Sequence, residues 1–340
     1  MTNPKLTIKE IAEMAGVSPT AVSFVINGRE GHVGKATRKK IKAVIKESGY
    51  HPNVASRRMR MNKTFNIALF YPSVASPFID LFYTDIVNSL ISQFSTHDYH
   101  LIHCPVETTE TGYITPKIIE HRDIDGAILL QSISPDIFQD LDTLAIPYIL
   151  VDWQDDAHEH ICVSVDCELA ISSAIHYLAK MGHRDIAFLG LDHVPYYFKR
   201  CLDGYQNTLK SLGLTYHPKF VHNTINDVES ASKCIKQLIE CNPAPTAVCC
   251  TSDMCAIYAM QAATSLGLTL PESLSFISID NILLSQFVTP PLTTVDYSKE
   301  EIGLKTANML LDMIGGTEVT SIAVSAKGIV ERQSVKNLQI

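Results

Sequence analysis

Residues 17–27, VSPTAVSFVIN, combine hydroxyl and amide side chains with one aromatic ring at helical spacing. Ser18 suits an N-cap and Pro19 suits the first turn, so we predict that a helix begins here. Its apolar face would hold Ala21, Val22, Val25 and Ile26, and its opposite face would hold Thr20, Ser23, Phe24 and Asn27. Hydroxyl and amide groups can hydrogen-bond to base edges or phosphates, and an aromatic ring can lie against thymine methyl groups. The second face therefore has the chemistry to contact DNA.

A second set of polar residues closes apolar runs in the later part of the chain. The set consists of Asp152 after YILV, Ser252 and Asp253 after AVCCT, Asp280 after SFISI, and Arg200, which we expect to open a helix after IAFLG. Carboxylates, a hydroxyl and a guanidinium that converge in a cleft suit a neutral polyhydroxylated ligand, because each ligand hydroxyl can donate and accept. The alternative for each Asp is that it only caps the next helix, and Asp253 is the most suitable cap.

Two more helices are predicted around the first segment. Thr7 and Glu10 have the spacing of a capping box, and the apolar stripe after them stops at Gly16. A third amphipathic helix from about 36 to 48 buries Ile41, Val44 and Ile45 and ends before Gly49. The first two helices have the helix-turn-helix arrangement, whose second helix can enter a major groove. Phe24 would then face bases, unless its ring packs back on the linker or on the third helix.

Residues 50–63, YHPNVASRRMRMNK, form a strongly basic segment. Pro52 suits a helix start, and about two helical turns can follow it. Because so short a helix is marginal alone in water, we expect it to be ordered only on DNA.

From residue 66 onward, short apolar runs alternate with amphipathic stretches, a pattern typical of parallel α/β layers. The runs are NIALFY, HLIHC, GAILL, YILV, ICVSV, IAFLG, AVCCT and SFISI, and the helices include residues 78–94, 168–181, 201–212, 228–241 and 253–266. About half of these elements precede residue 151, which predicts two similar lobes. Because ligands bind beyond the carboxyl ends of parallel strands, we expect the polar strand-end residues to face one cleft.

Charge divides the chain in a similar place. Residues 1–63 hold 13 Lys or Arg against 4 Asp or Glu, a net charge of +9, and the remaining residues carry −17. This asymmetry indicates a basic module for a polyanion joined to an acidic body, although a merely solvated basic helix is the alternative.

Several other classes are disfavoured. No run approaches the roughly 18 apolar residues of a membrane span, and the start of the chain lacks the apolar part of a signal peptide, so we expect a cytoplasmic protein without a membrane partner. The nine Cys are expected to be small core residues. The segment DDAHEH at 155–160 resembles a metal cluster, but its spacing fixes no ligand set, so a solvated loop is the better interpretation. Gly190 is not followed by a GxGxxG loop, and GxSxG and GK[ST] motifs are absent, so we expect neither a cofactor nor catalysis.

The motifs LTIKEIAEMAGVS, VSFVIN followed by GR, TRKKI, ESGYHPN and AS-x-x-M resemble, in order and spacing, the LacI/GalR family of bacterial transcription repressors. The resemblance implies that the second helix faces operator bases and that residues 53–60 form a hinge helix in the minor groove, with Met59 in place of a Leu wedge. Together with the chemistry above, the DNA-binding residues are expected to be Thr7, Ser18, Pro19, Thr20, Ser23, Phe24, Asn27, Asn53, Ser56, Arg57, Met59 and Arg60. Phe24 stands where the family usually has Arg, which removes a guanine-type donor and predicts a different operator preference.

The stretches SVASPF, DIDGAILL, IPYILVD, LAKMGHRDIAFLG, PTAVCCTSDMCA, LPESLSFISID, TPPLTTV and IVERQS are similar to the effector domain of the same family. The resemblance implies a periplasmic-binding-protein-like pair of lobes that forms homodimers. It also implies effector contacts from Phe78, Asp152, Arg200, Ser252 and Asp280. Ser252 replaces a more usual Asn, and Asn281 replaces a common second Asp, so the identity of the effector stays open.

The predicted architecture is an N-terminal all-α helix-turn-helix DNA-binding head at 1–51, a hinge helix and linker at 52–63, and an α/β effector body of two doubly wound lobes at 64–340. We expect the N-lobe at about 64–160 and 292–320 and the C-lobe at about 161–291 and 321–340, with crossings near Ala157, Pro290 and Thr320.

The expected function is repression of transcription under the control of a small molecule. The expected partners are double-stranded pseudo-palindromic operator DNA, a sugar or sugar derivative as effector, and a second copy of the chain. The alternatives are a small-molecule binding protein with a vestigial head and a regulator controlled by a protein co-effector.

Overall fold

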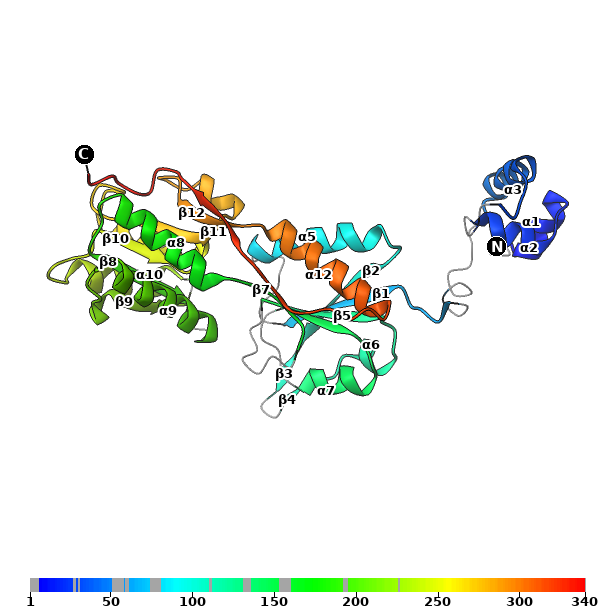
Figure 1. The fold of residues 1–340 in the computed structure, drawn as a ribbon, viewed down its shortest axis with the longest axis horizontal. Coiled ribbons are helices and arrows are strands. Elements are labelled where there is room, and N and C mark those ends of the chain that lie inside the picture. Colours follow the sequence, from blue (N-terminus) through cyan, green and yellow to red (C-terminus); the bar gives the residue numbers. More distant parts are fainter. Residues whose placement is uncertain are drawn as a thin grey trace. The chain divides into compact units, whose positions relative to one another are not determined.

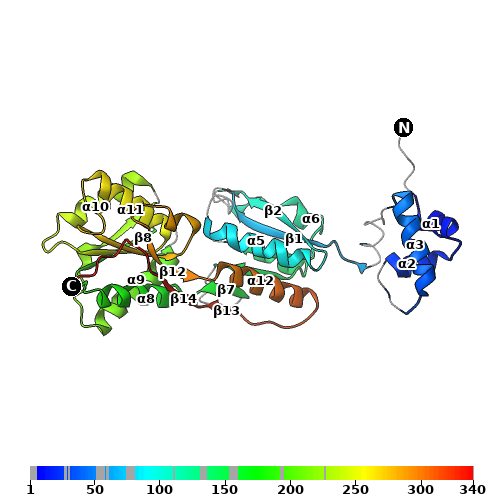
Figure 2. The ribbon, with the colours of Figure 1, turned by 90° about the horizontal axis from the view of Figure 1, so that it is seen from above.

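The computed structural model describes residues 6–26, 29, 31–50, 58, 61–73, 81–109, 112–130, 136–152, 160–191, 195–225 and 227–339. The chain divides into two compact units, Met1–Thr64 and Phe65–Ile340, which we call the head and the body. Figures 1 and 2 show the elements of each unit from two directions. The predicted fold class, an all-α head and an α/β body of two lobes, is confirmed.

The described residues of the head form three helices around one small apolar core. The helices are α1 (Ile8–Ala15), α2 (Pro19–Ile26) and α3 (Lys35–Ser48). The core side chains are Ile11, Ala12, Ala15, Val22, Val25, Ile41 and Tyr50. As predicted, Val22 and Val25 lie on the buried face of α2, and Ile41 is fully buried in α3.

The predicted ends of the head helices are confirmed. The Thr7 N–H donates to Glu10 Oε2 at 2.6 Å, and the Glu10 N–H donates to Thr7 Oγ1 at 3.4 Å, which closes a capping box at α1. Hydrogen bonds from the Thr7 backbone and hydroxyl hold the pKa of Glu10 below its ordinary value. Gly16 and Gly49 follow α1 and α3 in left-handed conformation, which glycine adopts without a steric cost.

The described residues of the body form two six-stranded sheets. The N-lobe sheet has the order β13-β7-β6-β5-β1-β2, and its strands are β1 (Asn66–Pro72), β2 (His100–Val106), β5 (Gly126–Leu130), β6 (Tyr148–Val151), β7 (Cys162–Val165) and β13 (Ile322–Val324). The C-lobe sheet has the order β14-β12-β11-β10-β8-β9, and its strands are β8 (Ile186–Leu191), β9 (Val221–Thr224), β10 (Ala247–Cys250), β11 (Ser275–Asp280), β12 (Thr293–Tyr297) and β14 (Ala326–Val330). Neighbouring strands run parallel in both sheets, except that β14 is antiparallel to β12. A small antiparallel pair, β3 (Thr108–Thr109) and β4 (Gly112–Tyr113), follows β2.

Helices cover both faces of each sheet, because alternate side chains of every buried strand point to opposite sides. In the N-lobe, α5 (Leu81–Ser95) and α12 (Lys299–Ile314) cover one face, and α6 (Lys117–Glu120) and α7 (Asp136–Thr143) cover the other. In the C-lobe, α8 (Cys167–Lys180) and α9 (Pro195–Ser211) cover one face, and α10 (Val228–Ile239) and α11 (Asp253–Ser265) cover the other. The short 3-10 helices are η1 (Pro218–Phe220) and η2 (Leu283–Gln286).

Within the described residues, the chain passes between the lobes three times, each time through a single residue. Asp166 joins β7 to α8, Ser298 joins β12 to α12, and Ser325 joins β13 to β14. The crossings expected near Ala157, Pro290 and Thr320, and the lobe limits drawn from them, are therefore wrong by several residues. Each predicted position lies just before a strand, namely β7, β12 or β13. That strand still pairs with the sheet of the lobe that the chain is about to leave, so the crossing comes only after it.

The three crossings are hydrogen-bonded to one another. The Asp166 N–H donates to the Val324 carbonyl at 3.3 Å, and Tyr297 Oη donates to the Asp166 carbonyl at 2.8 Å. Asp166 and Ser298 also cap α8 and α12 through their side chains. The junction is thus tied by backbone and side-chain bonds as well as by the covalent chain.

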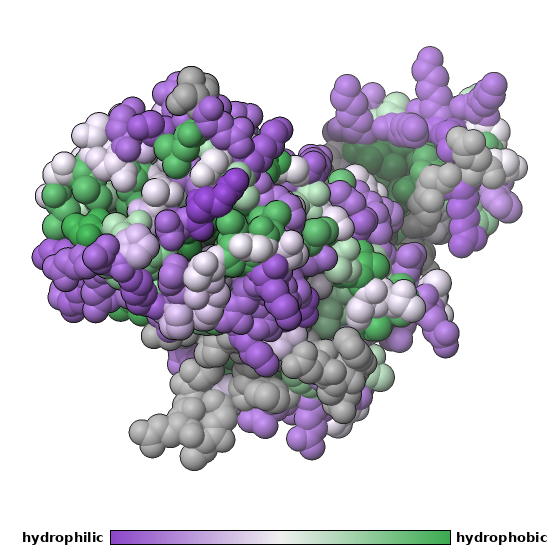
Figure 3. All heavy atoms as spheres, turned by 60° about the vertical axis from the view of Figure 1, so that its left-hand side comes forward, coloured by the Kyte–Doolittle hydropathy of each residue, from purple (hydrophilic) through white to green (hydrophobic). Residues whose placement is uncertain are grey.

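Most of the cysteines lie in the core, as the sequence predicts. Of the nine Cys, all except Cys241 are buried, which confirms that most are core residues. No helix in the described part of the chain is both long and apolar enough to cross a membrane. On the face drawn in Figure 3, hydrophobic residues lie interspersed among hydrophilic ones.

A buried histidine fastens the C-terminal segment to the C-lobe. His183 Nε2 lies 3.0 Å from the Lys336 carbonyl and must donate to it, so Nδ1 of the neutral ring accepts from the Thr246 hydroxyl at 2.9 Å. Burial lowers the pKa of His183 below its ordinary value of 6.5. A protonated Nδ1 would instead donate to Thr246 Oγ1, and the charged ring would lose its hydration at this buried position.

This geometry predicts the effect of His183→Gln on the pH dependence of stability. The folded-state pKa lies below the unfolded value, so the unfolded chain takes up the proton first, and the stabilisation is lost as pH falls below about 6.5. We expect the variant to lose about 1 kcal/mol at pH 8 and to show a shallower fall in the free energy of unfolding toward acid pH. Denaturant titrations across this pH range measure both quantities. The exposed His97→Gln is the control, and parallel profiles for wild type and His183→Gln would contradict the assignment.

Candidate functional site

Helix α2 presents the polar face that the sequence predicts. Pro19 and Thr20 are exposed at its start, and Ser23 is half-buried. The Ala21 N–H donates to Ser18 Oγ at 3.2 Å, so Ser18 caps this helix. Ser18, like Thr7 at α1, thus has a structural role as a cap, and the part that either plays in DNA binding stays a prediction.

Phe24 packs within the head in a way that neither sequence interpretation stated. Its ring is half-buried and lies 4.7 Å from the ring of His32, with the Arg29 guanidinium carbon 5.9 Å from its centroid. Arg29 is held in turn by its carbonyl, which accepts from Arg38 Nη2 at 2.8 Å. Phe24 therefore packs against Arg29 and His32, two basic residues that lie between α2 and α3.

Other predicted contacts lie outside the described residues. These are Asn27, Asn53, Ser56, Arg57, Met59 and Arg60 of the DNA-binding set and Phe78 of the effector set. The proposed hinge at 52–63 falls largely in the same category.

Strand direction and the crossings bring the strand-end residues of the two lobes together. Because β6 and β7 are parallel, Asp152 lies at the same edge as Val165, where the chain leaves the N-lobe. Because β11 and β12 are parallel, Asp280 lies at the same edge as Tyr297, where the chain leaves the C-lobe. Each crossing is one residue long, so the carboxyl edges of the two sheets face each other, as the predicted cleft requires.

At the N-lobe edge, Asp152 directly follows β6 with a φ of +54°. Tyr83 Oη, from α5, donates a hydrogen bond to Asp152 Oδ2. Tyr83 is buried and packs edge-on against Phe82. Sequence reasoning missed Tyr83, because it lies inside an amphipathic helix pattern that assigns an aromatic residue to the core.

At the C-lobe edge, Arg200 lies in the second turn of α9, which begins at Pro195. The expectation that Arg200 opens this helix is therefore wrong, because the aromatic residues before it already belong to the helix. Its Nη2 lies 3.5 Å from Glu168 Oε2, and hydrogen bonding with Tyr196 raises the pKa of Arg200 further. Both side chains of the ion pair are half-exposed, so the pair contributes little to stability and can rearrange for a ligand.

Phe198, in the first turn of α9, packs against the end of β8. A Cβ atom at Gly190, near the end of that strand, would lie 2.4 Å from a ring carbon of Phe198. Only glycine allows this approach.

Ser252, and not Asp253 as the sequence suggested, caps α11. Ser252 Oγ accepts from the Cys255 N–H at 3.1 Å and caps α11, whereas Asp253 was the expected cap. Asp253 is fully buried instead, and its carboxylate accepts from Ser278 Oγ (2.5 Å), Thr294 Oγ1 (2.5 Å), Ser285 Oγ (2.6 Å) and the Ile282 N–H (2.8 Å). Burial raises the pKa of Asp253, and these hydrogen bonds oppose the rise. The carboxylate joins β11, η2 and β12 below the candidate site.

Asp280 ends β11 with its backbone in the left-handed half of conformational space. Its φ is +118° and that of Asn281 is +51°, values that L side chains rarely adopt. Asp280 Oδ2 accepts from the Asp253 N–H at 3.4 Å. Lys299, which no sequence pattern singled out, donates from Nζ to the Asp280 carbonyl at 2.6 Å and to the Asn281 carbonyl at 3.0 Å.

The possible metal cluster at 155–160 has one described residue, His160. Its Nδ1 lies 3.0 Å from Tyr148 Oη, and its ring lies 4.3 Å from that of Phe138. His160 is thus packed against aromatic side chains. Among the residues that the structure describes, no group of three His, Cys, Asp or Glu is placed to hold a metal ion.

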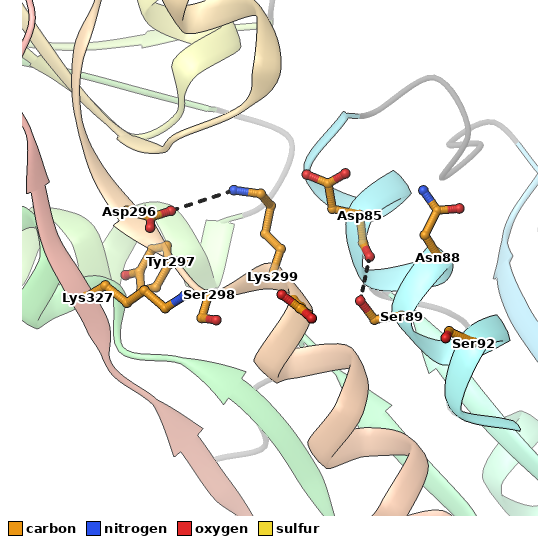
Figure 4. A pocket seen from close by; sticks show the side chains of 10 residues that line it. Asp85, Asn88, Ser89, Ser92, Asp296, Tyr297, Ser298, Lys299 and Lys327 are labelled. Carbon is orange, nitrogen blue, oxygen red and sulfur yellow. Dashed lines mark hydrogen bonds and ion pairs between the residues drawn. The ribbon is translucent and has the colours of Figure 1, made fainter. Parts of the chain in front are cut away.

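A pocket of about 440 Å³ lies beside the second crossing and is lined by residues of both lobes. Figure 4 shows its two walls. Helix α5 contributes Asp85, Asn88, Ser89 and Ser92, and the opposite wall consists of Asp296, Tyr297, Ser298, Lys299, Glu300 and Lys327. It does not include Asp152, Arg200, Ser252 or Asp280.

Comparison with protein-family models gives two matches. Residues 7–53 match the model described as bacterial regulatory proteins, lacI family, and residues 175–335 match a periplasmic binding protein-like domain. Among curated proteins, the chain is 31% identical over 319 residues to the HTH-type transcriptional repressor CytR of Escherichia coli K12, a match that covers 93% of this chain and 92% of that protein. It is 29% identical over 344 residues to the HTH-type transcriptional repressor PurR of Pasteurella multocida, covering 97% and 99%.

Solved structures agree on the fold. A transcriptional regulator CelR–cellobiose complex superposes with a TM-score of 0.69 at 25% identity, covering 97% of this chain and 99% of that one. A lac repressor dimer bound to operator and an anti-inducer superposes with a TM-score of 0.79 at 22% identity, with the same coverage.

The buried carboxylate predicts a large effect for Asp253→Ala. The change leaves hydroxyls and the Ile282 N–H without their acceptor, so we expect a loss of roughly 3 kcal/mol in the free energy of unfolding. Asp227→Ala, which removes the side-chain cap of α10, is the matched control and should cost about 1 kcal/mol. Denaturant unfolding followed by circular dichroism measures both. Equal losses in the two variants would contradict the role of Asp253 as a buried centre.

Proposed function

Because the chain belongs to the LacI family of bacterial regulatory proteins and is a DNA-binding transcriptional repressor, we propose that a sugar or sugar derivative bound between the lobes sets its affinity for operator DNA. The observation that carries the proposal is where these residues lie: Asp152 follows a strand of the N-lobe, Ser252 and Asp280 lie at strand ends of the C-lobe, and Arg200 lies in the second turn of α9. The CelR structure, which is a cellobiose complex, supports a carbohydrate class.

The chemistry of these groups suits hydroxyl-rich ligands. The two carboxylates accept hydrogen bonds and the guanidinium donates them, and a ligand hydroxyl can do either. The side chains have partners inside the body, such as Tyr83 for Asp152 and Glu168 for Arg200. A ligand must therefore replace or extend these bonds. Because it would do so on both lobes at once, its affinity would depend on the distance between the two edges.

Regulation follows from that sensitivity. A ligand that contacts both edges binds one angle between the lobes better than another, and it shifts the population toward that angle by its difference in affinity. The N-lobe begins at β1, directly after the head and the expected hinge at 52–63. We propose that the lobe angle changes the geometry of this hinge, in which Ser56 and Met59 would lie in the minor groove, while α2 with Pro19, Thr20 and Phe24 lies in the major groove.

We also propose that the repressor acts as a homodimer through the surface around η2. Leu283 and Phe287 are 62% and 71% exposed, and Leu284 beside them is partly exposed. Such a cluster of large apolar side chains is typical of an interaction surface. A two-fold dimer would present two heads to the two halves of a pseudo-palindromic operator.

The effector proposal is tested with a panel of pentoses, hexoses, disaccharides and nucleosides, screened by thermal shift and calorimetry on the full chain. We expect at least one member of the sugar-containing panel to bind, and Arg200→Ala and Asp280→Ala to weaken that binding about tenfold or more, because each loses a charged hydrogen bond. Arg184→Ala, which removes a C-lobe arginine that bonds to the Ala179 and His183 carbonyls, is the control. Failure of the whole panel, or equal binding to the Arg200→Ala variant, would refute a sugar effector at this edge.

The dimer proposal predicts that Phe287→Asp shifts the chain toward the monomer. A carboxylate in an apolar interface stays desolvated without a partner, so association should weaken strongly. Sedimentation velocity separates the 37.6 kDa chain from a species of twice that mass. Ile114→Asp, at a residue that is 56% exposed on the N-lobe, should leave the distribution unchanged. A dimer that persists in Phe287→Asp would place the interface elsewhere.

A further inference from the structure

Lys299 is a buried ammonium that joins the two lobes. The residue is 7% exposed, and its Nζ donates to the carbonyls of Asp280 and Asn281 and lies 3.9 Å from Asp296 Oδ1. An ammonium has three donors, so two of them serve carbonyl oxygens at the end of β11, and the third can be directed toward Asp296. Figure 4 shows this side chain extending from the first turn of α12 toward Asp296.

The helix that carries Lys299 is fixed to the N-lobe. A Cβ atom at Gly303, one turn further along α12, would lie 2.6 Å from the Ile86 carbonyl oxygen and 2.6 Å from Ser89 Cβ, so α12 and α5 pack backbone to backbone. Ile302, Ala307 and Leu310 continue this contact in the apolar core. Lys299 therefore moves with the N-lobe.

The carbonyls that Lys299 binds belong to the C-lobe. Asn281 is held there by Arg332, whose Nη2 donates to Asn281 Oδ1 at 2.7 Å, and by Asp296, whose Oδ1 accepts from Asn281 Nδ2 at 3.2 Å. The Asn281 N–H also contacts Thr294 Oγ1 at 3.3 Å. Asp280 and Asn281 thus form a strained backbone segment that the C-lobe holds from one side and Lys299 holds from the other.

The position of Lys299 is unfavourable by itself. A cation at the first residue of a helix opposes the helix dipole, and a buried ammonium loses its hydration. Both costs are offset only where the carbonyl acceptors are in place. Since donor and acceptors lie on different lobes, these bonds form at one lobe angle and lengthen at others.

We propose that Lys299 is a positioning residue that holds the lobe angle described here and, through the carbonyl of Asp280, places the Asp280 carboxylate at the candidate effector edge. The inference rests on the proposed function only in taking Asp280 as an effector contact. A ligand that displaces Asp280 also displaces the carbonyl oxygens to which Lys299 donates. The displacement is therefore transmitted to α12 of the N-lobe. Asp296 also belongs to the C-lobe, but it lies only three residues before Lys299, across the second crossing.

The first test measures the lobe angle without any small molecule. Spin labels at Gln139→Cys on α7 and Lys236→Cys on α10 report the interlobe distance by pulsed electron paramagnetic resonance. The background carries Cys241→Ser, which removes the half-buried thiol. Labelled chain is diluted with unlabelled chain so that only distances within one chain are read. We expect a narrow distribution for the parent and a broadened or shifted one for Lys299→Met, whereas Lys299→Arg keeps a cation and donors and should restore the narrow one.

Matched controls separate positioning from loss of stability. Lys327→Met changes another lysine that lines the same pocket, and Lys305→Met changes an exposed lysine of α12 that pairs with Glu301. Both should keep the parent distribution. A merely structural role would lower the melting temperature of Lys299→Met and leave the distance distribution of the folded chain unchanged, and that result would overturn the proposal. If Lys299→Met does not fold, Lys299→Gln is measured instead, with broadening expected because an amide cannot supply three donors.

The second test concerns coupling and uses the sugar or nucleoside that binds in the panel above, together with a duplex selected by the wild-type chain from random sequence. We expect Lys299→Met to lose most of the ligand-induced change in operator affinity while it still binds the duplex. An undiminished change would overturn the coupling. If no panel member binds, the effector proposal fails, and the distance measurement still decides whether Lys299 holds the lobe angle.

Discussion

The arrangement of the body depends on three single-residue crossings that are bonded to one another at the carboxyl edges of two parallel sheets. Asp166, Ser298 and Ser325 leave no slack between the lobes, and the bonds from Asp166 to Val324 and from Tyr297 to Asp166 tie the crossings together. The strand ends are consequently forced to face each other. Any ligand site made from these ends is shared between the lobes, which is the condition for binding to report on their relative angle.

Local sequence signals predicted most of the elements and the strand-end positions of three candidate site residues. The capping box at Thr7, the glycines after α1 and α3, and the apolar runs that became β5 and β6 depend on a few neighbouring residues, so pattern reasoning found them. Asp152, Ser252 and Asp280 were placed at strand ends for the same reason. Their ligand contacts remain a proposal, because a strand-end position does not show what the side chain binds.

Long-range pairing decided what the sequence did not predict. Whether a strand after a polar loop stays in its own sheet is set by partners over a hundred residues away, as for β13 beside β7, so the lobe limits were misplaced. Asp253 looked like a cap, yet hydroxyls from Ser278, Ser285 and Thr294 converge on it only in the folded C-lobe. Phe24 packs against His32 and Arg29, and Lys299 donates to two carbonyls of the other lobe. Neither contact follows from the helix or strand periodicity of the sequence.

The single residue between β13 and β14 also constrains how such a chain can diverge. One residue of a strand advances the backbone by about 3.3 Å and reverses the side on which each following side chain points. An insertion or deletion at Ser325 would therefore move the side chains of one strand to the opposite face of its sheet, or shift the two sheets relative to each other. A side-chain substitution at Ser252 or Arg200 changes neither sheet. New ligand preferences can arise by point substitution at the edges, while the length of this connection has to stay constant.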